Sequence, residues 1–100
     1  MTYEFDAAIW VWEARRTETW TFVTLPAEAS DEIADVADRY ARGFGSLRVD
    51  VTIGGTTWRT SIFPDGGQGG YVLPVKKAVR RAEGLEIGGT ARVRVTLVDV

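Results

Sequence analysis

Residues 71–100 read YVLPVKKAVRRAEGLEIGGTARVRVTLVDV, and this stretch says most about the fold. Its apolar start over residues 71–75 predicts a strand, and the alternation of apolar and polar residues over 92–97 predicts another. Between them, residues 76–83 predict a short helix, which Gly84 ends because glycine readily takes the left-handed conformation of a C-cap. The stretch therefore predicts a strand, a short basic helix, a glycine-bounded turn and a closing strand.

The short helix is predicted to be amphipathic. Its outward face carries the basic residues Lys76, Lys77, Arg80 and Arg81, and its inward face carries Ala78, Val79 and Ala82. Pro74, just before this helix, predicts an edge strand or a bulge, because proline has no N–H to donate to a sheet. After the helix, Leu85 and Ile87 predict a turn held by two apolar anchors.

Residues 47–63 predict a β-hairpin around Gly54-Gly55, a two-residue turn that requires positive φ. The turn fixes the register, with two core pairs and two pairs on a polar face: Val51 with Trp58, Leu47 with Ile62, Asp50 with Arg59, and Arg48 with Ser61. We expect an ion pair between Asp50 and Arg59, worth about 0–1 kcal/mol if exposed.

The first 26 residues predict two more strands. Alternation from Tyr3 to Val11 predicts the first, and Trp10 and Trp12 make its end apolar on both faces. A helix of the same chain is expected to cover the second face. A polar loop at 15–18 leads to the second strand over 19–23, which Pro26 ends.

A longer amphipathic helix is predicted to follow. Ser30 is the expected N-cap, with acidic residues in the first turn, and Gly43 is the expected C-cap. The expected buried stripe has the helical spacing i, i+3, i+4 and i+7 and consists of Ile33, Val36, Ala37 and Tyr40.

These elements predict one domain over residues 1–100, mainly β with a small α content. The expected architecture is a closed or double-split β-barrel of about six strands with one amphipathic helix and one short basic helix. Short strands and tight glycine turns favour a barrel over an open sheet, and a barrel also removes exposed edges.

Composition excludes several kinds of chemistry. The 100 residues include no Cys and no His, which removes disulfides, thiolate nucleophiles, the usual zinc sites and imidazole acid–base catalysis. No calcium-loop spacing is present. The sequence therefore favours a domain that is not an enzyme and needs no cofactor. Without a signal peptide pattern or a membrane-length apolar run, we expect a cytoplasmic protein.

The ordered set of motifs resembles the bacterial family called domain of unknown function 1905. The stretches that carry the resemblance are VDVTIGG (49–55), WRTSIFP (58–64), YVLPVKKAVRRA (71–82) and GLEIG (84–88), preceded by the strand ending in Leu25-Pro26 and the acidic start of the helix. The resemblance implies a double-split β-barrel and no known activity. Gly89 stands where the family commonly has Asp, which weakens any role for that carboxylate.

A second likeness concerns residues 76–89, which resemble the swapped-hairpin, AbrB-like DNA-binding motif. The proline that starts that motif would fall at Lys76, and its leucine would fall at Glu83, so both positions depart from it. Related barrel topology explains such a likeness without shared function. A DNA-binding regulator is therefore the alternative to a non-enzymatic ligand-binding or accessory module.

Charge is unevenly distributed along the chain. Residues 1–42 hold four basic and nine acidic side chains, a charge of −5, whereas residues 43–100 hold eight basic and five acidic side chains, a charge of +3. An unknown small anion is the expected ligand. The candidate binding residues are Arg48, Arg59, Ser61, Lys76, Lys77 and Arg80. With Arg81, Arg92 and Arg94, the lysines could instead contact nucleic acid, but aromatic residues do not interleave with these basic ones in the sequence.

Four tryptophans are many for a chain of 100 residues. Two or three are expected in the core, while Trp10 or Trp12 could remain exposed as a ligand or dimer surface, since aromatic residues are enriched at interfaces. The sequence leaves a monomer and a homodimer open.

Overall fold

The computed structural model describes residues 1–12, 20–40, 45–66 and 69–98. The described residues form seven strands and two helices: β1 (Thr2–Ala8), β2 (Trp10–Trp12), β3 (Trp20–Thr24), α1 (Ala27–Tyr40), β4 (Leu47–Ile53), β5 (Thr56–Pro64), β6 (Tyr71–Pro74), α2 (Lys77–Glu83) and β7 (Thr90–Leu97). The loop predicted at 15–18 and the C-cap predicted at Gly43 lie outside the described residues.

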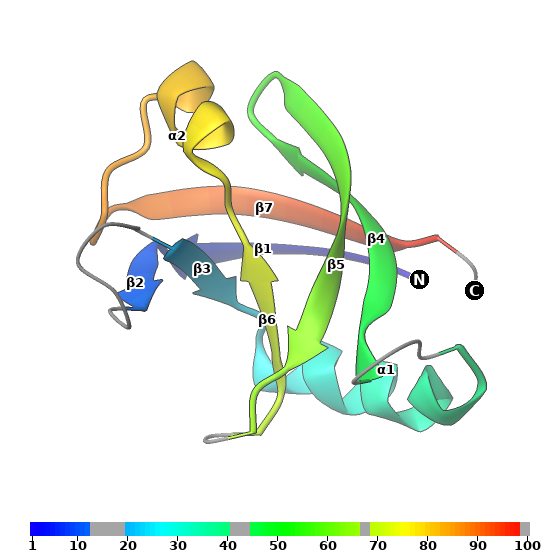
Figure 1. The fold of residues 1–100 in the computed structure, drawn as a ribbon. Helices are drawn as coiled ribbons and strands as arrows, with labels where there is room; N and C mark the ends of the chain where they lie inside the picture. Colours follow the sequence, from blue (N-terminus) through cyan, green and yellow to red (C-terminus); the bar gives the residue numbers. More distant parts are fainter. Residues whose placement is uncertain (13–19, 41–44, 67–68, 99–100) are drawn as a thin grey trace.

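All strands belong to one antiparallel sheet in the order β1-β7-β4-β5-β6-β3-β2. The sheet is curled, so that it forms a half-barrel, with α1 across one end and α2 at the opposite end (Figure 1). The mainly β fold with two helices is confirmed. The predicted number of six strands is wrong, because the N-terminal strand divides into two.

The division occurs at Ile9. The strand β1 pairs with β7 as far as Ala8, and β2 then pairs with β3 at the other end of the strand order. Ile9 is buried and makes two backbone hydrogen bonds to the turn before β7, donating to the carbonyl of Gly89 (2.8 Å) and accepting from the N–H of Gly88 (2.7 Å). These bonds hold the chain where it passes from one half of the sheet to the other.

The predicted β4–β5 hairpin is confirmed in register, including all four expected cross-strand pairs. Its turn has Gly54 at φ 58°, which a residue with a side chain rarely adopts. Every second residue of β4 is buried, from Leu47 to Ile53, and together with alternate residues of β7 these side chains make the centre of the core. The hairpin therefore provides one rigid wall of the half-barrel.

The helix α1 begins earlier than predicted. Pro26 accepts the first helical hydrogen bond, from the N–H of Ser30 (2.9 Å), so Ser30 lies inside the helix and the N-cap prediction is wrong. The buried Ser30 hydroxyl instead accepts the N–H of Tyr71 at the start of β6 (3.1 Å). Ile33 is fully buried as expected, which fixes the inner face of the helix.

The region from α2 to β7 agrees with the sequence analysis in outline. The helix is capped by Gly84 at φ 63°. Its buried residue is Val79, whereas Ala78 and Ala82, predicted to face inward, are exposed. Leu85 packs against the core, but Ile87 is 49% exposed, so the prediction of two apolar anchors is wrong for Ile87.

The tryptophans are placed differently from the prediction. Trp12 and Trp20 are 54% and 53% exposed, Trp10 is half-buried, and only Trp58 of the four, all described, packs against the core. The expectation of two or three core tryptophans is therefore wrong. The reason is that β3 turns Thr21 inward together with Val23, which leaves its aromatic residues on the outer face.

None of the described helices is long and apolar enough to cross a membrane.

Candidate binding site

The candidate site begins where β5 and β6 separate. They pair only through Phe63 with Val72 and Pro64 with Tyr71, and beyond these pairs the two strands diverge (Figure 1). The strand β6 is not the edge strand that Pro74 suggested, because β3 pairs with its other side. Pro74 nevertheless lies past the last pair with β5, where its missing N–H leaves no donor unsatisfied.

The far end of this opening is closed by α2. The Glu83 carboxylate accepts hydrogen bonds from the N–H of Gly55 (3.3 Å) and the hydroxyl of Thr56 (2.6 Å) at the tip of the β4–β5 hairpin. We call the opening between residues 57–62 of β5 and residues 74–77 the slot. It has strand pairing at one end and the Glu83 contact at the other.

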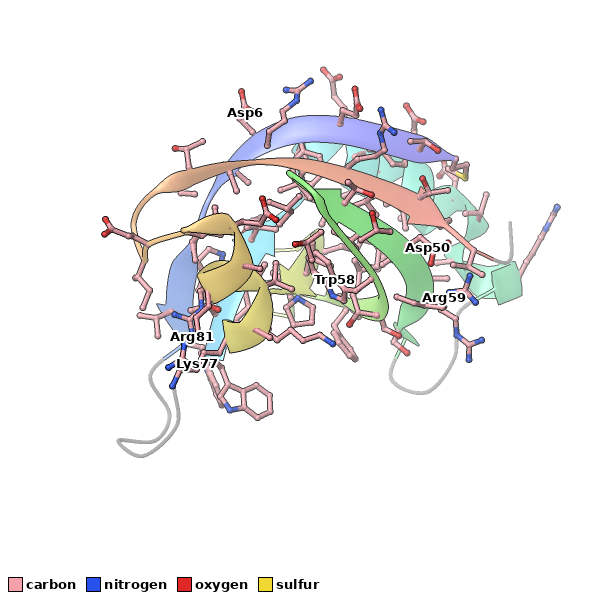
Figure 2. The ribbon with its side chains drawn as sticks, turned by 90° about the horizontal axis from the view of Figure 1, so that it is seen from above. Asp6, Asp50, Trp58, Arg59, Lys77 and Arg81 are labelled. Carbon is pink, nitrogen blue, oxygen red and sulfur yellow. The ribbon has the colours of Figure 1, made fainter. Side chains whose placement is uncertain are left out.

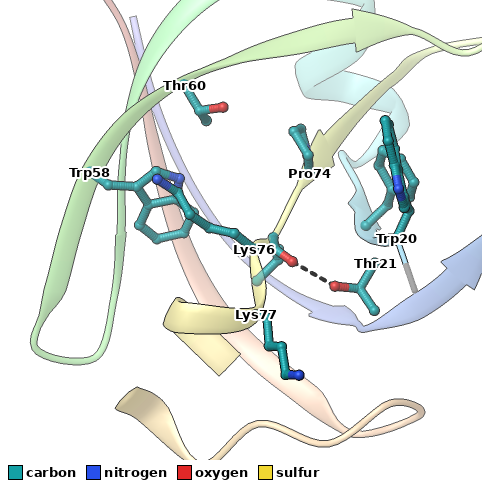
Figure 3. Close-up of a pocket in the computed structure, with 9 residues that line it drawn as sticks. Trp20, Thr21, Trp58, Thr60, Pro74, Lys76 and Lys77 are labelled. Carbon is teal, nitrogen blue, oxygen red and sulfur yellow. Dashed lines mark hydrogen bonds between the residues drawn. The ribbon is translucent and has the colours of Figure 1, made fainter. Parts of the chain in front are cut away.

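A cavity of about 300 Å³ lies in the slot (Figure 3). It is lined by aromatic, proline and aliphatic side chains with two threonines and two lysines: Trp20, Thr21, Phe22, Trp58, Thr60, Pro74, Val75, Lys76 and Lys77. Figure 3 shows the Lys76 side chain extending toward Trp58, and Lys77 pointing away from it. The Thr21 hydroxyl is used within the wall, since it donates to the carbonyl of Val75.

Trp58, which lines this cavity, carries a side-chain donor without a partner. Its indole Nε1 is buried and has no hydrogen-bond partner among the described residues. A buried N–H without a partner costs about 1–3 kcal/mol relative to a satisfied one. A ligand acceptor that reached this nitrogen would recover part of that free energy.

A second, larger hollow of about 600 Å³ continues from the slot over the outer face of β2, β3 and β6. We call it the aromatic groove. Its rings are ordered by two contacts: Trp10 stacks on Phe22 with centroids 5.1 Å apart, and Trp12 meets Trp20 edge to face at 6.3 Å. The Trp10 indole N–H donates to the Thr24 hydroxyl (2.9 Å), which fixes that ring. The remaining lining residues include Thr60, Phe63, Pro64, Asp65, Gly66, Val72 and Pro74.

The chain matches the sequence model of one known family. That family is described as a domain of unknown function, DUF1905, and its model matches residues 5–95. The chain belongs to the DUF1905 family. The match runs from β1 to β7 and includes both walls of the slot and the aromatic groove. No curated protein matches the chain.

The DUF1905 domain does not bring the six candidate binding residues together. Lys76 and Lys77 line the slot cavity, whereas Arg48, Arg59 and Ser61 lie on the other face of the β4–β5 hairpin and line neither cavity described above. Figure 2 shows Arg59 beside Asp50 on one side of the domain and Lys77 beside Arg81 on the opposite side. Arg80 stands apart, because its Nε is buried and has no partner among the described residues.

The predicted Asp50–Arg59 ion pair is present. The Arg59 guanidinium donates from Nε to Oδ1 of Asp50 (2.8 Å) and from Nη2 to Oδ2 (3.3 Å). These bonds hold the pKa of the Asp50 carboxyl below its ordinary value. Arg59 is therefore engaged by a carboxylate of its own hairpin.

Two further basic residues are also paired within the DUF1905 domain. Arg94 contacts the Glu4 carboxylate at 2.6 Å, and Arg92 lies 3.4 Å from Asp6, all on the outer face of β1 and β7. Consequently the basic residues of α2 and those of β7 do not form one patch of free charge. Among the described residues, no three acidic side chains cluster in a way that could hold a metal ion.

Sequence reasoning missed most of the cavity wall. Trp20 and Phe22 were assigned to a strand, but the face of the strand on which they lie was not, because Thr21 and Val23, which alternate with them, also suit a buried position. Thr60 and Pro74 join them only through the three-dimensional divergence of β5 and β6. The one signal that pointed to this place was Pro74, which marks a strand side without ladder pairing.

Proposed function

We propose that this DUF1905 domain is a binding module for a small apolar or aromatic anion, which it holds in the slot cavity. One observation carries the proposal: the cavity has rings on both sides, Trp20 and Phe22 on β3 and Trp58 on β5, with Lys76 and Lys77 at its rim. Ligand sites typically combine an apolar lining with a few polar groups that orient the ligand.

Each part of the wall supports a different part of the ligand. The rings favour a flat apolar body, because offset stacking adds about 0.5–1.5 kcal/mol per pair to the burial of area. The lysines favour a negative charge, and the Trp58 N–H favours an acceptor. A volume of about 300 Å³ is at the lower end for ligand sites, so the ligand is about the size of one or two fused rings.

The test compares 2-naphthoate with 2-naphthamide, which have the same ring system and differ in charge. We expect calorimetric titration to show the carboxylate binding several-fold more tightly. Lys76→Gln and Lys77→Gln should each weaken naphthoate about two- to fivefold, as expected for losing one exposed charge partner. Trp20→Ala should weaken both compounds.

Arg81→Gln is the matched control, because it removes the same charge from α2 at a residue that does not line the cavity. Arg59→Gln controls for the outer face. Equal affinity for the acid and the amide would contradict the proposal. If only the Arg59 variant lost binding, the result would locate the binding site on the face that carries Arg48, Arg59 and Ser61.

Nucleic-acid binding is a second candidate, because the structure brings Lys76 and Lys77 next to Trp20 and Phe22, which the sequence order did not. Stacking rings beside basic side chains bind single strands with little sequence preference. Fluorescence anisotropy of a labelled oligothymidylate at 50 and 200 mM salt tests it. Two lysines predict a shallow salt slope of about −1.4, and absence of binding at 50 mM salt removes this candidate.

A further inference from the structure

The slot cavity and the aromatic groove form one continuous hollow, because they share the lining residues Trp20, Phe22, Thr60 and Pro74. The strand β5 gives the order of the two parts. Trp58 lines only the cavity, Thr60 lines both parts, and Phe63 lines only the groove. The hollow therefore follows β5 from the slot toward the end of that strand.

The opposite wall gives the same order. Residues 75–77 line only the cavity, Pro74 lines both parts, and Val72 lines only the groove. The two walls match along their length because β5 and β6 are antiparallel. The strand β6 ends at Pro74, and Lys76 is also extended, with φ −71° and ψ 157°. Five residues from 72 to 77 therefore make the hollow roughly 16 Å long, at about 3.3 Å per residue.

The floor of the groove is a layer of rings on one face of the sheet. Residues that pair directly across antiparallel strands share a face, and so do residues two apart in one strand. One row across the strands consists of Pro74, Phe22 and Trp10, and the next consists of Trp20 and Trp12. An apolar chain in the groove would lie on these rings.

The groove offers few polar groups to an occupant. Besides indole N–H groups, its polar side chains are those of Thr60 and Asp65, and the Trp10 N–H already donates to Thr24. A sugar or a peptide would bury hydroxyl or amide groups there with too few partners, which is unfavourable. An alkyl chain has no such groups, and its burial is favourable.

Positive charge lies at the opposite end of the hollow. Lys76 and Lys77 line the cavity, whereas no basic side chain is among the described residues that line the groove. The hollow is therefore basic at one end and apolar along the rest of its length. A ligand that complements both parts has an anionic head and an apolar tail.

We propose that the ligand of the slot is an alkyl carboxylate, with its carboxylate at Lys76 and Lys77 and its unbranched chain running past Thr60 and Pro74 into the aromatic groove. This inference rests on the proposed function, since it uses the same cavity and the same lysines. Each carbon of an extended chain advances it by about 1.25 Å, given C–C bonds of about 1.5 Å, so the hollow takes about 12 carbons. The occupant is a free, monomeric alkyl carboxylate of about that length.

A chain-length series tests the use of the groove. Calorimetric titration compares the even-numbered carboxylates from butanoate to tetradecanoate, each below its micelle concentration. Full burial of a methylene strengthens binding about fourfold, so a half-covered one should strengthen it about twofold. Dodecanoate should therefore bind about 60-fold more tightly than hexanoate, with no further gain for tetradecanoate. Dodecan-1-ol, which lacks the charge, should bind several-fold more weakly than dodecanoate.

Variants of the groove test the place of the chain. Phe63→Ala removes a ring that lines only the groove and should weaken dodecanoate about three- to tenfold, while 2-naphthoate stays within about twofold. If that variant proves unstable, Trp12→Ala, at a residue that is 54% exposed, tests the same loss. Ile87→Ala is the matched control, because Ile87 is 49% exposed and lines neither part. Lys77→Gln should weaken both ligands, and Arg81→Gln neither.

The direction of the chain is a separate prediction. In NMR spectra of the complex with dodecanoate, the terminal methyl should show nuclear Overhauser contacts to the rings of Phe63 and Trp10. The protons next to the carboxylate should show them to Lys76 and Trp58. The reverse pattern would overturn the inference.

The outcomes separate the two proposals. Binding of 2-naphthoate, without any gain in affinity from butanoate to dodecanoate, overturns the inference and leaves the proposed function standing. Equal affinities for dodecanoate and dodecan-1-ol overturn the placement of the carboxylate. If neither 2-naphthoate nor any alkyl carboxylate binds, both proposals fail. Sedimentation with vesicles of anionic phospholipid, without binding of monomeric dodecanoate, would assign the rings to a membrane surface and overturn the inference. A dimer in light scattering that excludes dodecanoate would assign them to a second copy of the chain, with the same consequence.

Discussion

The contact that closes the slot gives a quantitative prediction. Gly54 has φ 58°, and a Cβ added there would clash with the Glu83 carboxylate oxygen that accepts the Gly55 N–H. Gly54→Ala should therefore cost two amounts at once. The left-handed backbone costs an alanine about 1–2 kcal/mol. Displacing Glu83 costs its two hydrogen bonds to the hairpin, together about 1–2 kcal/mol at this partly exposed place.

A double-mutant cycle separates these amounts. Gly54→Ala should destabilise the domain by about 2–4 kcal/mol and Glu83→Ala by about 1–2 kcal/mol, each measured by urea unfolding. The double variant should be no less stable than Gly54→Ala alone, because alanine at position 83 removes the obstacle. The resulting coupling is about 1–2 kcal/mol, or roughly 4–16 °C in melting temperature for a domain of this size.

Gly84→Ala is the matched control. Gly84 has nearly the same backbone angle, φ 63°, but no atom lies within 4 Å of the position of a Cβ. It should show the backbone cost alone, about 1–2 kcal/mol. Strictly additive costs for Gly54→Ala and Glu83→Ala would refute the contact, as would equal destabilisation by alanine at positions 54 and 84.

Three further predictions concern the frame of the site. Ser30→Ala removes the hydroxyl that accepts the buried N–H of Tyr71 and should lower the free energy of unfolding by about 1–3 kcal/mol, measured by chemical denaturation. No change in this free energy would show that the hydrogen bond does not stabilise the domain. Asp50→Asn removes an exposed ion pair and should change the free energy of unfolding by less than about 1 kcal/mol. In the variant Arg59→Gln, NMR titration should show that the lowered pKa of the Asp50 carboxyl returns to its ordinary range. Burial, together with a hydrogen bond to the Glu32 carboxylate, raises the pKa of Tyr3 from 10.0 to about 12, so the phenol stabilises the fold fully below pH 10 and loses that contribution as pH rises toward 12. The melting temperature of Tyr3→Phe should therefore fall less steeply than that of the wild type between pH 10 and pH 12. Parallel curves of melting temperature against pH would contradict the raised pKa of Tyr3.

The sequence predicted the hairpin best, and for a physical reason. A two-glycine turn between alternating apolar residues leaves one register that buries Leu47, Val51 and Ile62 together, since a slip by one residue would expose all three. The same alternation identified β7. Gly84 ended α2 as expected because a left-handed C-cap is a local requirement.

The failures share a different cause, which is competition between equally good local signals. Ser30 has a side chain suited to an N-cap, but its hydroxyl accepts the N–H of Tyr71 at the start of a distant strand, and the first helical hydrogen bond already runs from the N–H of Ser30 to Pro26. In β3, Thr21 and Trp20 are on opposite faces, and only the curl of the sheet decides that the threonine goes inward.

The candidate site was harder to predict than the fold. The basic residues Lys76 and Lys77 were visible in the sequence, but the rings beside them come from strands far away along the chain. The slot forms because β5 and β6 stop pairing beyond Phe63 and Val72. The alternation of apolar and polar residues within one strand does not show where a neighbouring strand diverges from it. Arg48, Arg59 and Ser61 were grouped with the lysines because sequence alone does not tell the two faces of the half-barrel apart.

The most direct test of the proposed site is a titration of the ¹⁵N-labelled domain with 2-naphthoate, followed by NMR. We expect the indole N–H signals of Trp58 and Trp20 to move most, together with the backbone amides of Thr60 and Lys77, and the amide of Arg59 to remain in place. Shifts gathered at Arg48, Arg59 and Ser61 instead, or no saturable shift at all, would contradict a binding site in the slot.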